Sequence, residues 1–383
     1  MSQSMTHSLA DPRAETLVSA QALVSSYENS GYARTHPSIL QPAEPFLDLS
    51  GEDIRSRMFL TSGRSGEELC LRPDFTIPVS RDYLASNAAG TAQGYCYLGP
   101  VFRDRGSLPG EFLQAGIESF GRTDRAAADA ETMALGLEAT AHFGRAAPDV
   151  RIGDVGLFAG MVAALDLAPA WKRRLVKDFN RKATLAQDLD RLTLGNANGK
   201  PDYQGVLAAL AGSDPKAARA LVTDLLSIAG ITTVGGRSVG EIADRFLEQS
   251  TLGASATLPP YTRALVERFL AVTGNPLEAS VTMRQIASDG GIVLTPALDL
   301  FDARNVELAK RGVDLKRLTF SSAFGRGMDY YTGFVFELTD GDSAEPLVAG
   351  GRYDDLMTRL GSSSPIPAVG FSIWIERLAG DAA

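Results

Sequence analysis

Hydrophobic positions along the chain follow the helical period in some segments and the strand period in others. Apolar residues recur at helical spacing over 12–30 and over 126–143, which predicts an amphipathic helix in each range. Gly31 follows the first range at a position where helices commonly stop. A short strand at 150–152 is expected to lead into a further helix at about 155–165.

Strand-like alternation fills much of the remaining N-terminal part and returns near the C-terminus. The ranges that predict strands are 69–71, 95–102, 112–121, 318–322 and 330–338. In the last range, Thr332, Phe334 and Phe336 would share one face. The proline-rich stretch 37–46 predicts irregular chain. Strands in runs and clustered helices indicate an α+β fold with a mainly antiparallel sheet.

The pattern changes between about 170 and 280, where helical spacing dominates and glycines at 195–199 and 235–236 interrupt it. We therefore expect a mostly helical insertion at 171–280 within a core domain formed by 1–170 and 281–383. A chain of 383 residues is long enough for this division. It can bury roughly three quarters of its unfolded surface, so a self-sufficient core is expected.

Composition excludes several classes of function. The net charge of −9 argues against a large phosphate-binding footprint. With 3 histidines and 2 cysteines, the chain cannot build a histidine-rich metal site. Cys70 and Cys96 are expected to be reduced, buried thiols rather than a disulfide. The N-terminus lacks a signal-like pattern and no run of ~18 apolar residues occurs, so we expect a cytoplasmic protein.

The first segment with recognisable chemistry is Arg72-Pro73-Asp74-Phe75-Thr76. It puts a carboxylate and a hydroxyl two residues apart just past a strand. On an extended backbone these two side chains would share a face that suits capture of a ligand ammonium group. A turn with a solvated aspartate is the competing interpretation.

The second segment is the strand at 112–121. Phe112, Gln114, Gly116 and Glu118 would lie on one of its faces. A buried glutamine and a buried glutamate need partners, because an unpaired buried carboxylate is very costly. The competing interpretation is an edge strand whose polar face meets water, and the flanking hydrophobic residues disfavour it.

Two glycine-rich segments near the C-terminus complete the candidate chemistry. Arg326 stands between two glycines, where no neighbouring side chain prevents it from binding a ligand carboxylate with two hydrogen bonds. Tyr330 and Tyr331 then offer an aromatic wall and a hydroxyl. The second segment, 349–356, is expected to be a glycine hairpin that presents Tyr353.

The order of these segments, ending in Gly-Phe-Ser-Ile-Trp-Ile-Glu-Arg at 370–377, resembles the histidyl-tRNA synthetase family from about residue 12 to 378. The similarity is greatest to a paralogous family, the ATP phosphoribosyltransferase regulatory subunits, which share the Leu-Arg-Pro-Asp-Phe-Thr segment. The resemblance implies a class II aminoacyl-tRNA synthetase-like antiparallel sheet flanked by helices. Only five residues follow Leu378, so we expect no anticodon-binding domain.

The resemblance also implies a histidine pocket. Its residues would be Asp74, Thr76, Arg103, Gln114, Glu118, Arg326, Tyr330, Tyr331 and Tyr353. By similarity, Asp74, Thr76 and Gln114 would hold the α-ammonium group. Glu118 and Tyr331 would face the imidazole, and Tyr353 would line the pocket.

The ATP half of a synthetase site looks altered. Arg326 would meet the histidine carboxylate, and Arg103 matches the position that contacts the ATP α-phosphate in synthetases. Arg105 replaces a glutamate that holds the adenine amine in that family. Trp374 replaces a glycine in the strand beneath the adenine, and an indole adds about 150–250 Å² of surface there. We therefore expect that adenylation is lost.

By similarity, this would be a non-catalytic regulatory subunit. It would bind histidine for feedback inhibition and support the short-form catalytic subunit in the first step of histidine biosynthesis. The resemblance further implies synthetase-like dimers within a hetero-octamer, without cofactor, metal, tRNA or membrane. Two alternatives stay open: an adenylate-forming ligase with a non-tRNA acceptor, and a truncated synthetase that needs a separate anticodon-binding chain.

Overall fold

The computed structural model describes residues 12–194, 258–341 and 345–380, together with short stretches between 220 and 238. The chain divides into two compact units. One comprises Met1–Gly160 and Phe269–Ala383, and the other comprises Met161–Arg268. Within the predicted insertion, residues 195–257 apart from those short stretches lie outside the described residues.

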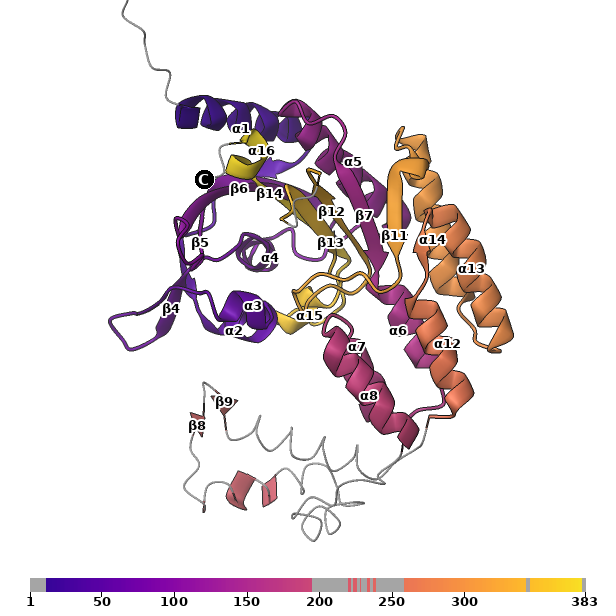
Figure 1. Cartoon of the computed structure of the whole chain (residues 1–383). Helices are drawn as coiled ribbons and strands as arrows, with labels where there is room; N and C mark the ends of the chain where they lie inside the picture. The colour runs from indigo at the N-terminus through magenta and orange to yellow at the C-terminus, as the bar shows by residue number, and fades with distance from the viewer. Residues whose placement is uncertain are drawn as a thin grey trace, which may run out of the picture. The chain divides into compact units, whose positions relative to one another are not determined.

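A nine-stranded sheet forms the centre of the first unit (Figure 1). Its strands, in spatial order, are β1 (Ala33–Arg34), β5 (Gln93–Phe102), β6 (Glu111–Phe120), β14 (Ala368–Trp374), β13 (Val348–Arg352), β12 (Phe334–Thr339), β7 (Asp149–Asp154), β11 (Leu318–Ser321) and β10 (Thr273–Gly274). Neighbours are antiparallel except for β1 with β5 and β7 with β11. The expected α+β fold with a mainly antiparallel sheet is confirmed.

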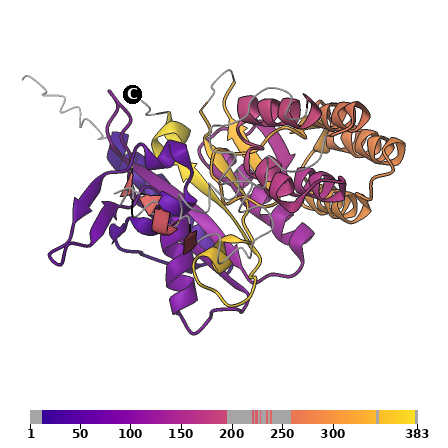
Figure 2. The same cartoon turned by 90° about the horizontal axis from the view of Figure 1, so that it is seen from below.

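Helices cover one face of this sheet. They are α1 (Pro12–Asn29), α5 (Arg125–His142) and α16 (Ile375–Ala379), with α14 (Thr295–Lys310) packed on α5 and α13 (Pro276–Asp289) beside β10 and β11. Tyr27 of α1 packs edge-on against Phe371 of β14. Gly136 lets α5 approach Phe336 closely, since a Cβ there would lie 3.3 Å from the ring. In Figure 2, the orange α13 and α14 lie at the opposite end of the unit from the indigo N-terminal elements.

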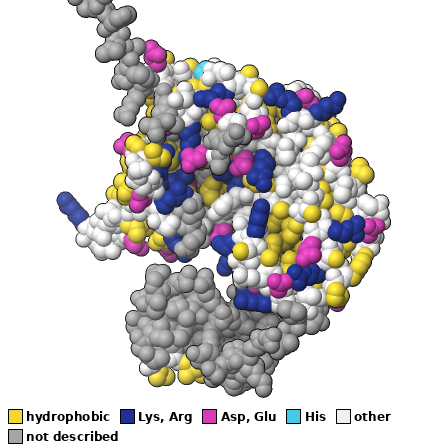
Figure 3. Space-filling model, viewed as in Figure 1, with side chains coloured by type: hydrophobic (Ala, Val, Ile, Leu, Met, Phe, Trp, Pro, Cys, Tyr) yellow, Lys and Arg dark blue, Asp and Glu magenta, His cyan; other side chains and the backbone are white. Residues whose placement is uncertain are grey.

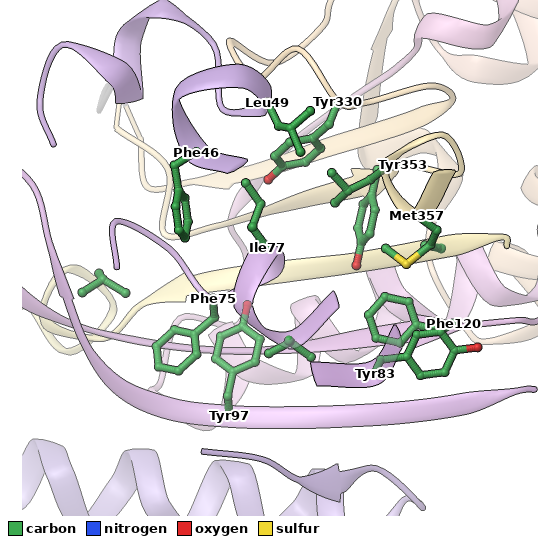
Figure 4. Packing of buried hydrophobic residues seen from close by; sticks show 14 of the residues in the cluster. Phe46, Leu49, Phe75, Ile77, Tyr83, Tyr97, Phe120, Tyr330, Tyr353 and Met357 are labelled. Carbon is green, nitrogen blue, oxygen red and sulfur yellow. The ribbon is translucent and has the colours of Figure 1, made fainter. Parts of the chain in front are cut away.

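The other face of the sheet carries shorter elements and the aromatic core. Figure 1 shows α4 (Thr76–Ala85) inside the curve of β5 and β6. On the same side lie α2 (Glu44–Leu49), α3 (Glu52–Arg55), α15 (Leu356–Arg359) and the small sheet β2 (Leu40–Pro42), β4 (Glu68–Leu71) and β3 (Leu60–Ser62). Phe75 stacks on Tyr97 with ring centroids 4.3 Å apart, and Tyr83 stacks on Phe120 at 4.5 Å (Figure 4).

The described part of the second unit is mostly helical. The chain enters this unit within α6 (Val155–Ala164), continues through α7 (Pro169–Lys177) and α8 (Lys182–Leu194), and leaves it within α12 (Pro260–Leu270). β8 (Thr233–Val234) and β9 (Arg237–Ser238) form a short antiparallel pair. The buried Asp188 carboxylate on α8 accepts a 2.5 Å hydrogen bond from Arg174 Nε on α7, which ties these two helices together.

Several predictions are confirmed, including the helices at 12–30, 126–143 and 155–165 and the stop at Gly31, whose φ is +95°. Both cysteines are buried and free, as expected. The prediction of irregular chain over 37–46 is wrong, because β2 and the start of α2 lie there. No helix of the described chain is long and apolar enough to span a membrane.

Two predictions near the C-terminus are also wrong. The strand expected at 330–338 begins only at Phe334, because the preceding residues turn toward Arg352, whose carbonyl accepts a hydrogen bond from Thr332 N. The glycine pair expected in a hairpin lies within β13 instead. A Cβ on Gly350 would lie 2.2 Å from Gly370 O, so this glycine is required for close pairing with β14.

Candidate functional site

The polar strand predicted from the sequence lies in the middle of the large sheet. β6 pairs with β5 on one side and β14 on the other, so the edge-strand interpretation is wrong. Gln114 and Glu118 share its inner face, which α4 covers. Both are buried, with 1% and 0% of their surface exposed.

Three hydroxyl groups from three elements converge on the Glu118 carboxylate. Thr76 Oγ1 at the start of α4 donates to Oε1 at 2.8 Å, and Tyr97 on β5 donates to the same oxygen at 3.4 Å. Tyr353, just after β13, donates to Oε2. In Figure 4, the Tyr97 ring points upward and the Tyr353 ring points downward, so that both hydroxyls lie in the layer between the two rings.

Glycine on β14 makes room for this carboxylate. Gly370 lies opposite Glu118 in the register, and a Cβ there would lie 1.8 Å from Glu118 Oε2. Burial raises the pKa of Glu118 from 4.5 to about 8; the hydrogen bonds from Tyr353 and Thr76 oppose this rise, and the nearby Asp74 adds to it. Burial thus favours the neutral form of the Glu118 carboxyl group.

Asp74 lies in the loop between β4 and α4. The expectation of an extended backbone through Thr76 is wrong, because Thr76 is the first residue of α4. Asp74 Oδ1 accepts a weak 3.4 Å hydrogen bond from Ile77 N, while the buried Oδ2 has no partner. Burial raises the pKa of Asp74, and the positive charge of Arg103 partly offsets this. Arg103 Nε donates to Pro73 O at 2.7 Å, which fixes the loop.

Two further buried polar atoms on the same face lack partners. They are Gln114 Oε1 on β6 and Arg326 Nε in the loop before β12. The Arg326 side chain is 11% exposed, and its Nη1 lies 4.0 Å from Glu337 Oε2. Burial raises the pKa of Tyr331, and the charge of Arg326 opposes that rise, as expected for neighbouring groups.

Tyrosines form one wall of the site. The centroids of Tyr330 and Tyr331 are 4.9 Å apart, and those of Tyr331 and Tyr353 are 6.5 Å apart. Tyr330 donates to Met328 Sδ at 3.0 Å. The structure thus brings the nine predicted residues to one face of the first unit. It adds Tyr97 and Gly370, which sequence patterns missed because nothing local to them indicates which strand lies alongside.

The end of the site nearest Gln114 is filled by aromatic and basic side chains. Trp374 lies opposite Gln114 on β14 and is 7% exposed. The Arg377 guanidinium lies 5.2 Å from the Trp374 ring and donates to Pro346 O at 3.1 Å. The Arg105 guanidinium stacks on Phe112, 4.9 Å from the ring centroid. This end therefore presents a packed indole rather than an open floor.

Behind the tyrosine wall lies a buried chain of ion pairs. Asp129 on α5 is fully buried between Arg304 at 3.0 Å and Arg352 at 2.6 Å. Arg304 also donates to Asp154 at 2.6 Å, and Arg352 donates to Asp354 at 2.9 Å. Because every member is paired, this chain holds α5, α14, β7 and β13 together.

Among the described residues, no group of three or more His, Cys, Asp or Glu side chains could hold a metal ion. Basic and acidic side chains are interspersed over the described surface seen in Figure 3, where neither sign forms a large patch.

The Histidyl-tRNA synthetase family model matches residues 9–239 and 240–378. Curated proteins from Brucella canis and Brucella melitensis biotype 1, named ATP phosphoribosyltransferase regulatory subunit, are 42% identical over 344 residues, which covers 89% of this chain and 90% of theirs. The chain belongs to the ATP phosphoribosyltransferase regulatory subunit family. A regulatory subunit of this family is not itself the catalytic enzyme.

Solved structures agree on the fold of this regulatory subunit. An ATP phosphoribosyltransferase regulatory subunit/histidyl-tRNA synthetase from Bacillus halodurans superimposes with a TM-score of 0.66 at 21% identity, covering 100% of this chain and 84% of that one. A histidine–tRNA ligase subunit from Alicyclobacillus acidocaldarius gives a TM-score of 0.56 at 22% identity, covering 99% and 96%. The regulatory subunit therefore has the histidyl-tRNA synthetase-like fold.

Proposed function

We propose that this regulatory subunit binds free L-histidine at the Glu118 site and does not activate it. The observation that carries the proposal is the set of three buried, unpartnered polar atoms: Asp74 Oδ2, Gln114 Oε1 and Arg326 Nε. Two are acceptors that suit an ammonium group, and the third is a donor that suits a carboxylate. Together they match the two charged groups of a free amino acid.

The rest of the site suits an imidazole side chain. Glu118 can accept a hydrogen bond from a ring N–H, and its hydroxyl neighbours hold it in place. Tyr331 and Tyr353 offer aromatic faces beside it. A ligand N–H group or cation would give the Glu118 carboxylate a polar contact in place of the water contacts that it loses on burial.

Loss of adenylation is part of this proposal. Trp374 fills the strand position next to Gln114, and Arg377 packs on the indole. Arg105 stacks on Phe112 and brings a positive charge where an adenine amine would need an acceptor. These contacts favour a ligand-sensing subunit over an adenylate-forming ligase.

We further propose that a short-form ATP phosphoribosyltransferase catalytic subunit is the partner. The names of the Brucella relatives support this, because a regulatory subunit acts on a catalytic one. Histidine bound here would inhibit the partner, within a cytoplasmic hetero-octamer built on synthetase-like dimers and without tRNA. Such feedback needs a difference in histidine affinity between two states of the complex.

Calorimetry and exchange assays test the proposal. Histidine should bind the purified chain, while histidine-dependent ATP–pyrophosphate exchange stays at background. Added to a short-form catalytic subunit, the chain should raise turnover and confer inhibition by histidine. Absence of histidine binding, or robust exchange, would show that the proposed function is wrong.

A further inference from the structure

A two-bond connection joins the loop that carries Tyr331 to the segment that carries Tyr353. Thr332 N donates to Arg352 O at 2.9 Å, and Thr332 Oγ1 accepts from Asp354 N at 3.0 Å. The first bond ends at the residue before Tyr353 and the second at the residue after it. Thr332 itself directly follows Tyr331, so these two bonds join the backbone segments that carry Tyr331 and Tyr353.

The Asp354 end of this connection is firmly held. Its Oδ1 accepts from Arg352 Nη1 and from Ala368 N, both at 2.9 Å, and its Oδ2 lies 3.3 Å from Arg125 Nη2. Arg352 is in turn bound to the fully buried Asp129. The Tyr353 segment is thus fixed to β13, β14 and α5, and Thr332 attaches the Tyr331 loop to it.

We infer that Thr332 is a positioning residue, whose hydroxyl sets Tyr331 against Tyr353 and hence against Glu118. Tyr353 donates directly to Glu118, and Tyr331 stands 6.5 Å from Tyr353 between centroids. Displacement of the Tyr331 loop would therefore move the aromatic wall relative to the carboxylate that receives the ligand ring. This inference rests on the proposed function, and it assigns specificity for the ring end of the ligand to a residue that does not touch it.

Two substitutions at Thr332 separate the effect of the hydroxyl group from the effect of the side chain's shape. Thr332→Val keeps the shape and removes the acceptor for Asp354 N, whereas Thr332→Ser keeps the acceptor. We expect Thr332→Val to weaken binding of histidine and of histidinol, which lacks the carboxylate, by the same factor. Its upper limit is about five, because binding must then restore an arrangement that one neutral hydrogen bond held. Thr332→Ser should bind both as the wild type does.

The control is Thr273→Val, which removes a hydroxyl that donates to Phe320 O at 3.0 Å in another part of the unit. It should leave both affinities unchanged. If the wild type binds histidine and Thr332→Val binds it equally well, the inference is overturned. A loss confined to histidine would also overturn it, because it would place the effect at the carboxylate end.

A ligand-free measurement decides the inference even if histidine does not bind. In protein labelled with 3-fluorotyrosine, the ¹⁹F resonances of Tyr331 and Tyr353 are assigned with Tyr331→Phe and Tyr353→Phe variants. Thr332→Val should shift or broaden the Tyr331 resonance, while Thr332→Ser and Thr273→Val leave it in place. An unchanged Tyr331 resonance in Thr332→Val overturns the inference, whereas absence of histidine binding by the wild type overturns only the proposed function.

Discussion

Glu118→Gln should make the protein more stable at high pH. The side chain is fully buried, and the folded protein holds its pKa at about 8 against an ordinary value of 4.5. Glutamine mimics the protonated acid in shape and can keep bonds to Thr76 and Tyr353. The variant therefore removes the titration and leaves the packing nearly unchanged.

The sign and size follow from proton linkage. A raised pKa means that the folded state binds the proton more tightly than the unfolded state does. Proton binding therefore stabilises the wild-type fold fully below pH 4.5, and this stabilisation is lost as pH rises through 8. A difference of 3.5 pH units at 1.36 kcal/mol each gives an upper limit of about 5 kcal/mol. The stability of Glu118→Gln relative to the wild type should rise over this range and level off above it.

Urea unfolding of both proteins between pH 5 and 9 measures this difference. The control is Glu131→Gln, because the pKa of Glu131 is lowered: burial raises it, and the bonds from Arg122 and Tyr32 outweigh burial. Its difference from the wild type should stay constant from pH 6 to 9. If the Glu118→Gln difference is equally flat, Glu118 is ionised in the folded protein at neutral pH and the reasoning is wrong.

Three further substitutions test separate parts of the structure. Arg326→Ala should abolish histidine inhibition of the reconstituted complex and leave its assembly, judged by co-elution, intact; inhibition that persisted would place the feedback site elsewhere. Asp129→Asn should cost about 3–5 kcal/mol in urea unfolding, because it leaves Arg304 and Arg352 short of a buried charge, and a loss below about 1 kcal/mol would contradict this. Gly370→Ala should lower both thermal stability and histidine affinity, since its Cβ would lie 1.8 Å from Glu118 Oε2; wild-type affinity would refute the contact.

The sequence predicts most regular elements of the first unit correctly where hydrophobic period and local residue type agree. The inner face of β6 is an example, because Gln114 and Glu118 alternate with the apolar Ala115 and Ile117 over a ten-residue strand. The stop of α1 at Gly31 is another, because the positive φ there favours glycine. In both cases the signal lies within a few neighbouring residues.

Elsewhere, contacts with distant parts of the chain override the local pattern. Thr76 lies in the first turn of a helix, where Pro78 is tolerated, and its hydroxyl is bound to Glu118 on β6, a partner that the local pattern does not reveal. The alternation of 330–338 does not continue a strand through Thr332, because Thr332 bonds to Arg352 and Asp354 instead. The alternation of apolar and polar residues near Thr76 or Thr332 does not reveal which distant residues these threonines bind.

Two buried aspartates in the first unit differ in the partners that their carboxylates have. Asp129 is bound to two arginines, whereas Asp74 is held by the backbone N–H groups of Ile77 and Thr76 and keeps a buried oxygen with no partner. Among the carboxylates of the described residues, only Asp74 has such a buried oxygen. A buried group left unpaired costs about 1–3 kcal/mol, which a bound ammonium group would offset.

That offset should appear directly as stability. A ligand that binds only the folded state adds about 2.7 kcal/mol at a concentration of 100 times its Kd. Histidine should therefore raise the melting temperature of the wild type, and Asp74→Asn should reduce the rise, because it replaces a charged acceptor with a neutral one. Under the proposed loss of adenylation, with Trp374 paired opposite Gln114, none of this binding energy is spent on catalysis. It is available to favour one state of the complex over another, and a wild type whose melting temperature does not respond to histidine would show that no such energy exists.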